Sequence, residues 1–272
     1  MIHRSHSHLA SPVAWLAKPY PEIVDIAEND GSVLIVPVGS LEQHGYHLPV
    51  ATDTLLATAV AHAAAEDVHE SLPVLVTPPI WSGCSPHHLP FGATISLETA
   101  TLLEVLSDVA GRALENGFDA LLFLNGHGGN MPVISSAVSD AGHEHPDREV
   151  LGLSYFHLAR AVIDEVRESD PGGISHGGEF ETSLMMHLYP ELVDETQLEG
   201  TQRDEPYDLG RQDLFADGPL SVYRTFDEYS HSGAIGAPEL ATAEKGKRLF
   251  VHIETELSDL LSEIHTQNST RK

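Results

Sequence analysis

Short apolar runs that alternate with helix-forming stretches are the feature of this chain that most constrains its fold. Four runs read as buried strands, at residues 33–38, 73–77, 120–124 and 150–156. Strands separated by helices are typical of a parallel sheet, because parallel neighbours need a crossover connection between them. The sequence therefore predicts an α/β fold.

Helical patterns occupy most of the intervening chain. We predict helices at 54–66, 97–115, 179–189 and 241–265, with Ser96 as the N-cap of the second and Asn116-Gly117 as its end. The segment 195–236 is polar and weakly periodic. Connections of this length are usually functional or disordered, so we expect this one to cover a site.

The length and composition favour one large soluble domain. We place it at 11–265, with flexible ends at 1–10 and 266–272, because 272 residues with 41% hydrophobic content can bury a sizeable core. Apolar runs are too short for a membrane span, and the first residues lack a signal core, so a cytoplasmic protein is expected. Cys84 is the only cysteine, which excludes an internal disulfide and a multi-cysteine zinc site.

The charge balance is strongly acidic. Asp and Glu number 41 against 14 Lys and Arg, a formal net charge of −27. Such a surface repels nucleic acid and anionic membranes, so neither is an expected partner. The acidic residues are spread along the whole chain, which suits a halophilic cytoplasm where salt screens their repulsion. An ordinary acidic enzyme is the alternative interpretation.

A polar motif follows the first predicted strand. It reads Gly39-Ser40-Leu41-Glu42-Gln43-His44-Gly45-Tyr46-His47-Leu48-Pro49, with Asp53 shortly after. In open α/β sheets ligands sit beyond the carboxyl ends of strands. Glu42 and His44 are two residues apart, so in extended chain both point to one side, and with Asp53 they suit a divalent ion. The alternative is a polar loop in which Thr52-Asp53 caps the next helix.

A second motif, Asn125-Gly126-His127-Gly128-Gly129-Asn130, follows the third predicted strand. Its glycines permit close approach of the backbone to a ligand, and the helix after it offers free N–H groups. A simple turn with a structural histidine is the alternative. Because two strand ends deliver histidine motifs, the metal interpretation is favoured.

Two further motifs complete the candidate site. His176 precedes a predicted helix and is a natural proton carrier beside a metal, while Glu179 and Glu181 are alternative metal ligands or supporting residues. The fourth motif follows the second strand, where Ser85 and His88 are candidates for the pocket rim. A hydrogen-bonded loop pair is an equal alternative for His87 and His88.

These motifs, taken in order, resemble the creatininase (creatinine amidohydrolase) superfamily. The similarity spans roughly residues 11–248 and includes Gly236-Ala237-Pro238 and Ala241-Thr242-Ala243-Glu244-Lys245-Gly246 near the C-terminus. The resemblance implies a three-layer αβα sandwich with a mostly parallel central sheet and a homo-oligomer, often a hexamer.

The resemblance also implies a site with two divalent ions, for which Zn, Fe(II) and Mn all suit mixed carboxylate and imidazole ligands. Glu42, Asp53 and His127 would bind one ion, and His44 and Asp53 the other, with Asp53 bridging. Ser85 matches a substrate-contacting serine, and His176 a histidine near the substrate, which makes it the catalytic candidate.

The sequence departs from creatininase itself at Gly128 and Gly129, where that enzyme has a tyrosine that touches substrate and a glutamate that binds metal. Gly128 and Gly129 would instead line space for substrate, and Glu181 is the predicted replacement ligand. The motif is more similar to two other branches, an archaeal formamidopyrimidine-nucleotide deformylase and a mycofactocin peptidase.

We therefore expect a metal-dependent amidohydrolase that cleaves a non-peptide carbon–nitrogen bond of a small molecule, such as the formamido-pyrimidine nucleotide of flavin and deazaflavin synthesis. Hydrolysis of creatinine, trimming of a mycofactocin-type precursor peptide, and a non-catalytic metal-binding oligomer are the alternatives.

Overall fold

A four-stranded parallel sheet forms the centre of the molecule in the computed structural model, which describes residues 10–210, 213–215 and 218–270. The strands are β1 (Val33–Val38), β2 (Val74–Val76), β3 (Ala120–Asn125) and β4 (Glu149–Ser154), in the spatial order β2-β1-β3-β4. Strand order reverses beside β1, because β2 and β3 pair with its opposite edges. Ligands in such sheets bind where the order reverses.

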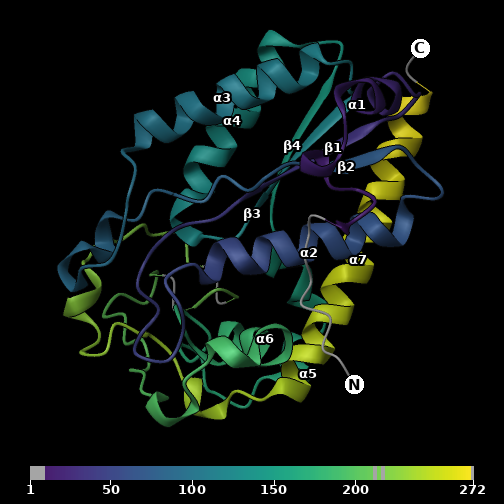
Figure 1. Ribbon diagram of the computed structural model, residues 1–272. Helices are drawn as coiled ribbons and strands as arrows, with labels where there is room; N and C mark the ends of the chain where they lie inside the picture. The colour runs from purple at the N-terminus through teal and green to yellow at the C-terminus, as the bar shows by residue number, and fades with distance from the viewer. Residues whose placement is uncertain (1–9, 211–212, 216–217, 271–272) are drawn as a thin grey trace.

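Helices cover both faces of this sheet, as Figure 1 shows. One face carries α2 (Thr52–Val68), α5 (Ile163–Val166), α6 (Glu179–Leu188) and α7 (Ala243–Ser269), and the other carries α1 (Tyr20–Ala27), α3 (Thr99–Glu115) and α4 (Met131–Glu144). Side chains of β1 alternate between the layers: Ile35 packs on the α2 side and Leu34 on the α3 side. The predicted three-layer αβα sandwich is confirmed.

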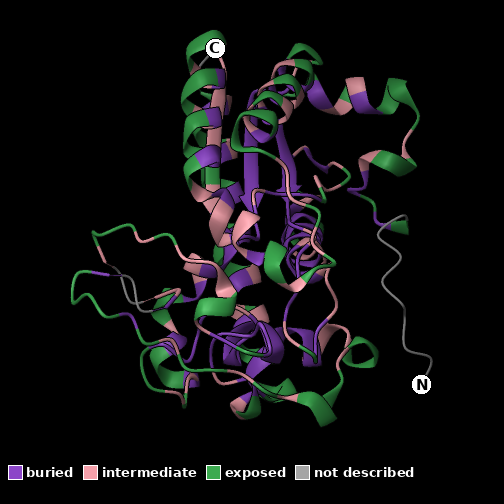
Figure 2. Ribbon diagram, turned by 90° about the vertical axis from the view of Figure 1, so that its left-hand side faces the viewer, coloured by how far each residue is buried: buried purple, intermediate pink, exposed green. Residues whose placement is uncertain are grey.

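Burial explains why β1 and β3 are apolar throughout. All six residues of each are buried, since helices pack on both of their faces, and Figure 2 shows buried strands at the centre of the molecule. The edge strand β4 is less buried. The predicted strand and helix types were correct, but α1 and the four-residue α5 were missed. Helix α1 has only eight residues and has a proline in its first turn, a position that suits proline.

Several predicted boundaries were wrong. Helix α3 begins at Thr99, and Ser96 does not cap it; its hydroxyl accepts a hydrogen bond from the Ser85 N–H instead. Strand β4 ends at Ser154, where a 3-10 helix (Tyr155–Ala161) takes over. Helix α7 continues to Ser269, so residues 266–269 are helical rather than part of a flexible end. The predicted flexible N-terminus lies almost entirely outside the described residues.

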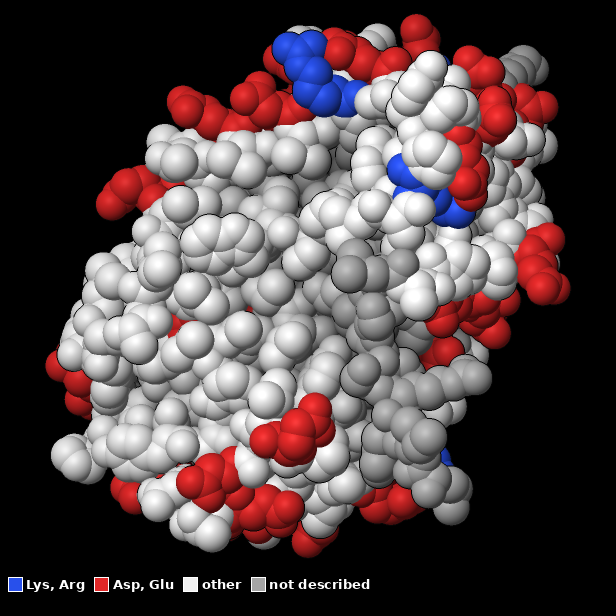
Figure 3. Space-filling view, in the orientation of Figure 1, with Lys and Arg blue, Asp and Glu red and all other residues white. Residues whose placement is uncertain are grey.

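The surface is acidic on several sides. Figure 3 shows Asp and Glu side chains along the top, right and bottom of one view, with few Lys or Arg between them. In the described part of the chain, no helix combines the length and apolarity required to cross a membrane.

Candidate metal centre

Loops at the carboxyl ends of the strands bring the polar motifs together. Glu42 and His44 lie in the loop after β1, and Asp53 lies in the first turn of α2, where the helix dipole favours a carboxylate. The alternative that Thr52-Asp53 caps this helix is wrong, because Ala51 is the N-cap and no side chain caps it. The His44 Nε2 atom lies 3.0 Å from Asp53 Oδ1, and all three side chains are buried.

His127 reaches the same place from the end of β3. Its Nδ1 atom lies 3.1 Å from Glu42 Oε1 and 3.2 Å from Asp53 Oδ2. Asn125 fixes this loop, since its amide oxygen accepts from the His127 N–H and its amide nitrogen donates to the His127 carbonyl. The tips of β1 and β3 therefore converge, as the metal interpretation requires.

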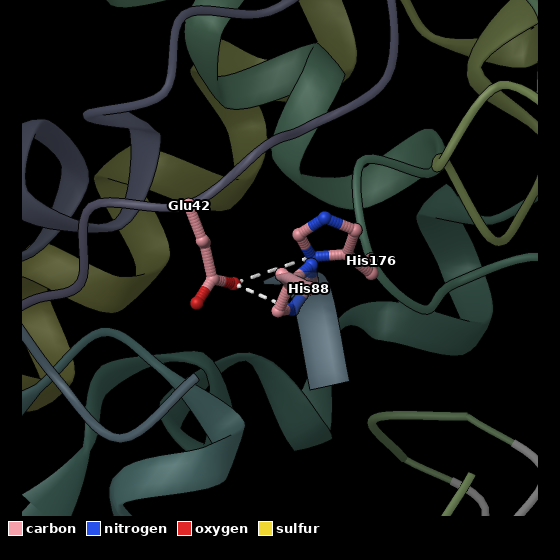
Figure 4. Close-up of side chains that lie close together, drawn as sticks. All are labelled: Glu42, His88 and His176. Atoms are coloured by element: carbon pink, nitrogen blue, oxygen red, sulfur yellow. Dashed lines mark ion pairs between the residues drawn. The ribbon is translucent and has the colours of Figure 1, made fainter. Parts of the chain in front are cut away.

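Two further imidazoles face Glu42, as Figure 4 shows. The Glu42 Oε1 atom lies 3.1 Å from His88 Nε2 and 3.5 Å from His176 Nδ1. Gln43 holds both rings. Its side-chain amide donates to His88 Nδ1 at 2.9 Å, and its backbone carbonyl accepts from His176 Nε2 at 2.5 Å. His88 is thus inside the site, whereas the sequence had placed it at the rim or in a loop pair.

The structure separates the two glutamates of α6. The Glu179 carboxylate is bound by Lys245 Nζ at 2.6 Å and by the backbone N–H groups of Glu168 and Ser169, so it anchors α6 to neighbouring segments. Glu181 instead points to the site, with Oε2 4.0 Å from His44 Nε2 and 2.6 Å from the Gly177 N–H. Only Glu181 is placed to contribute to a metal centre.

The predicted substrate-contacting residues occupy different positions. Ser85 is fully buried behind the carboxylate of Glu42, to which its hydroxyl donates, and it lies 3.2 Å from His127 Nε2. Gly128 lies beside open space, because a Cβ atom there would meet no atom within 4 Å. At Gly129 a Cβ atom would meet His127 Nε2 at 2.4 Å, so the His127 ring occupies the space that a side chain would need.

Tyr155 was missed by sequence reasoning. It follows β4, is fully buried, and its hydroxyl has no hydrogen-bond partner among the described residues. Burial and the nearby charges of Glu181 and Asp53 raise its pKa well above the usual value. A tyrosine in an apolar strand-end context carries no signal that distinguishes it from a core residue.

The buried charges shift one another strongly. Burial alone would raise the pKa of the Glu42 carboxyl, but the charges of His127 and His88 hold it well below its usual value. Burial likewise opposes protonation of His44, yet Asp53 outweighs it and raises the His44 pKa to about 9. Paired carboxylates and imidazoles of this kind are common at functional sites.

Two groups are shifted toward their neutral forms. Burial, followed by the charges of His44 and His88, lowers the pKa of His176 well below its usual value. Burial raises the pKa of Glu181 to about 7, although the His44 charge opposes the shift. His176 is therefore neutral near pH 7.

Within the described part of the chain, three groups of side chains have ligand atoms close enough to share an ion. They are Glu42–Asp53–His127, His44–His176–Glu181 and Glu42–His88–His176. Buried atoms without a hydrogen-bond partner point into the cluster, namely Glu42 Oε1, Asp53 Oδ2 and His88 Nε2. Buried polar atoms are normally satisfied, and carboxylate and imidazole donors suit a divalent ion, so these residues fit a metal.

A cavity of about 400 Å³ opens onto this cluster. One part of it is lined by Asp53, His127, His176 and Glu181. Another part is lined by residues 218, 220–224 and 226. The Phe226 ring contacts the imidazoles, with centroids 4.3 Å from His88 and 5.2 Å from His176. The predicted role of segment 195–236 as a cover for the site is consistent with this lining.

The creatininase family model, described as creatinine amidohydrolase, matches residues 19–261. The chain belongs to the creatininase family. It is 36% identical to the mycofactocin precursor peptide peptidase of Mycobacterium ulcerans, over 81% of this chain and 80% of that protein. It is 32% identical to the creatinine amidohydrolase of Pseudomonas putida, over 85% and 89% of the two chains.

The fold agrees with that assignment. A solved structure described as creatininase Mn superposes with a TM-score of 0.79 at 30% identity and covers 92% of this chain and 98% of that one. The chain is accordingly a hydrolase of the family that acts on carbon–nitrogen bonds, and it carries candidate metal-ligand clusters at the position described above.

Proposed function

We propose that this chain hydrolyses an amide bond near the C-terminal end of a short peptide, with two divalent ions in its site. The observation that carries the proposal is the open cavity beside Gly128 at the candidate metal centre. Creatininase itself resembles this chain but places a substrate-contacting tyrosine at that position, so the open space favours a larger substrate than creatinine.

The similarity to a peptide peptidase supports the choice of a peptide. This similarity favours a peptide substrate over the non-peptide small molecule expected from the sequence. The formamido-pyrimidine nucleotide and creatinine belong in the same assay as competing substrates.

The way the ligand groups overlap supports two ions. Glu42–Asp53–His127 and His44–His176–Glu181 share no residue, whereas the third group overlaps both. The two oxygens of Asp53 also face different rings, Oδ1 toward His44 and Oδ2 toward His127, as a bridging carboxylate would. Zn, Mn and Fe(II) are the proposed metals.

The chain's own residues supply the proton transfers. When bound, a divalent ion supplies Lewis acidity to the scissile carbonyl and lowers the pKa of water. Neutral His176 lines the cavity, and its Nε2 atom is held by the Gln43 carbonyl, so Nδ1 is the atom able to accept a proton from water and return it to the leaving nitrogen. His176 also belongs to two of the three ligand groups, so its role needs a test that separates binding from turnover.

Two substitutions make that test. Asp53→Ala removes the shared carboxylate, so we expect loss of bound metal and of peptide cleavage together, measured by elemental analysis and mass spectrometry. His176→Ala should lose cleavage while it retains at least one ion. Replacement of His143, an exposed histidine of α4, is the matched control and should change neither. Full turnover by the Asp53 variant would refute the proposal.

We also propose a homo-oligomer, in line with the family resemblance, and no nucleic-acid or membrane partner. One face over α2 carries few charged side chains in Figure 3, and the exposed Trp81 and Leu16 offer apolar surface. Light scattering at high salt would give the assembly size, with a monomer as the contrary result.

A further inference from the structure

We infer that Arg203 and Arg224 form a subsite for an anionic group of the substrate, a carboxylate or a phosphate. Both arginines line the cavity that opens onto the candidate metal centre. Basic residues are scarce in this chain, which has 14 Lys and Arg against 41 Asp and Glu. Two of them at one cavity therefore oppose the charge of the rest of the molecule.

The guanidinium of Arg203 retains unused donors. Its Nε atom is buried and has no hydrogen-bond partner among the described residues. Among the described residues, its ion-pair contact from Nη2 to Glu205 Oε2 is 3.6 Å long. Charge-assisted hydrogen bonds are usually about 2.7–2.9 Å, so this contact leaves the guanidinium fork able to bind another acceptor. A buried donor without a partner costs free energy, and a substrate oxygen would recover it.

Arg224 has a similar environment. Its Nη1 atom lies 3.5 Å from Glu228 Oε2, and its side chain is 30% exposed. Both guanidinium carbons lie near one ring, that of Tyr229, at 5.2 Å for Arg203 and 6.0 Å for Arg224. The two cations are thus held beside one aromatic surface, which orients them without neutralising them.

Two acidic residues lie nearby among the described residues. Glu205 accepts a hydrogen bond from the Tyr229 hydroxyl at 2.9 Å, while its Oε1 atom is buried and has no hydrogen-bond partner there. Asp213, which also lines the cavity, pairs with Arg167 at 3.0 Å and accepts from the Gly172 N–H. The Asp213 charge is shared with Arg167, whereas Glu205 offsets part of the Arg203 charge and leaves the Arg203 Nε donor for an anion.

The position of the arginines relative to the imidazoles sets the substrate's shape. The Phe226 ring centroid lies 5.2 Å from that of His176 and 6.4 Å from that of Tyr229, and the Tyr229 ring contacts both arginines. The printed contacts thus connect the arginines to the imidazoles through two aromatic rings. A substrate that reaches both parts would carry its anion away from the scissile bond, as the C-terminal carboxylate of a short peptide would.

The choice of a peptide carboxylate as the ligand rests on the proposed function, so the test measures binding separately from cleavage. The probes are an N-acetylated tripeptide with a free carboxylate, the same tripeptide as its C-terminal amide, and a pyrimidine nucleoside 5′-monophosphate. Each is titrated by calorimetry into metal-loaded protein carrying His176→Ala, with and without Arg203→Met or Arg224→Met. Arg112→Met, on an exposed arginine of α3, is the matched control.

We expect the arginine variants to weaken binding of one anionic probe by about tenfold or more, because a hydrogen bond to a charged group is lost, and the control to leave it unchanged. A carboxylate ligand would show this effect with the acid and not with the amide, and a phosphate ligand would show it with the nucleotide. If neither anionic probe depends on the arginines, the inference is wrong. Arginine-dependent binding without cleavage of any peptide by the wild-type chain would support the subsite and refute the proposed function.

Discussion

The contact between Lys245 and Glu179 offers a quantitative test of how α7 holds the site. Lys245 Nζ lies 2.6 Å from Glu179 and 2.7 Å from Glu168, and it donates to the Leu240 carbonyl. The Glu179 side chain is 2% exposed, whereas that of Glu168 is 66% exposed. Lys245→Met would therefore leave one buried carboxylate without its cation, while the loss at Glu168 is screened by water.

The expected cost follows from these environments. Removing one partner of a buried ion pair costs about 3–5 kcal/mol, and an exposed pair contributes about 0–1 kcal/mol. Glu179 keeps the N–H groups of Glu168 and Ser169, which offsets part of the loss. We expect Lys245→Met to lower the free energy of unfolding by about 3 kcal/mol, as judged from the buried-pair range.

Urea unfolding of the metal-free protein, followed by circular dichroism, measures this loss. Arg248→Met on the same helix is the control, because its contact with Glu165 is 3.5 Å long and both side chains are well exposed; its cost should stay below about 1 kcal/mol. Adding Glu179→Gln to Lys245→Met removes the unpaired charge and should recover part of the stability. Equal losses for Lys245→Met and Arg248→Met would refute the reasoning.

Three further predictions concern the site loop, pH and salt. Gly129→Ala should weaken metal binding, since its Cβ would meet His127 Nε2 at 2.4 Å, whereas Gly128→Ala meets nothing; equal metal affinity in a chelator competition would contradict this. Burial and then the His44 charge lower the pKa of His47 to about 4, so below pH 6.5 the unfolded chain binds a proton that the folded chain rejects, and stability falls as the pH drops from 6.5 toward 4. In metal-free protein the loss attributable to His47 should reach about 1 kcal/mol at pH 5.5, and His47→Gln should remove it. With a formal charge of −27, the unfolding midpoint should rise between 0.1 and 2 M KCl, and an unchanged midpoint would refute the halophilic interpretation.

The strands and the convergence of the main candidate ligands were predictable because their physical signals are local. Residues 33–38 and 120–124 are apolar throughout, as strands buried on both faces must be, and the motifs directly after them could only lie at one edge of a parallel sheet. The order of Glu42, His44 and Asp53 along the first loop also indicated a shared site. The structure brings these side chains together.

The remainder depended on distant contacts. His88 lies in the site because the Gln43 amide holds its ring, a contact between residues 45 positions apart. The choice between Glu179 and Glu181 was settled by Lys245, which comes from the last helix. Ser96 satisfies a cap pattern but bonds to the Ser85 backbone. For His88 and Glu179 the partners lie far along the chain, and for Ser96 the partner is a backbone group that the cap pattern does not include.

The close crossing of α6 and α7 has a consequence for how the protein matures. A Cβ atom at Gly246 would lie 1.9 Å from the Ser183 carbonyl, and the adjacent Lys245 binds Glu179, so α7 sets the position of the helix that carries Glu181. During synthesis the ribosome delivers α7 after every candidate ligand has emerged. The nascent chain would therefore hold its carboxylates and imidazoles unassembled until α7 has emerged, and metal uptake should follow the synthesis of α7.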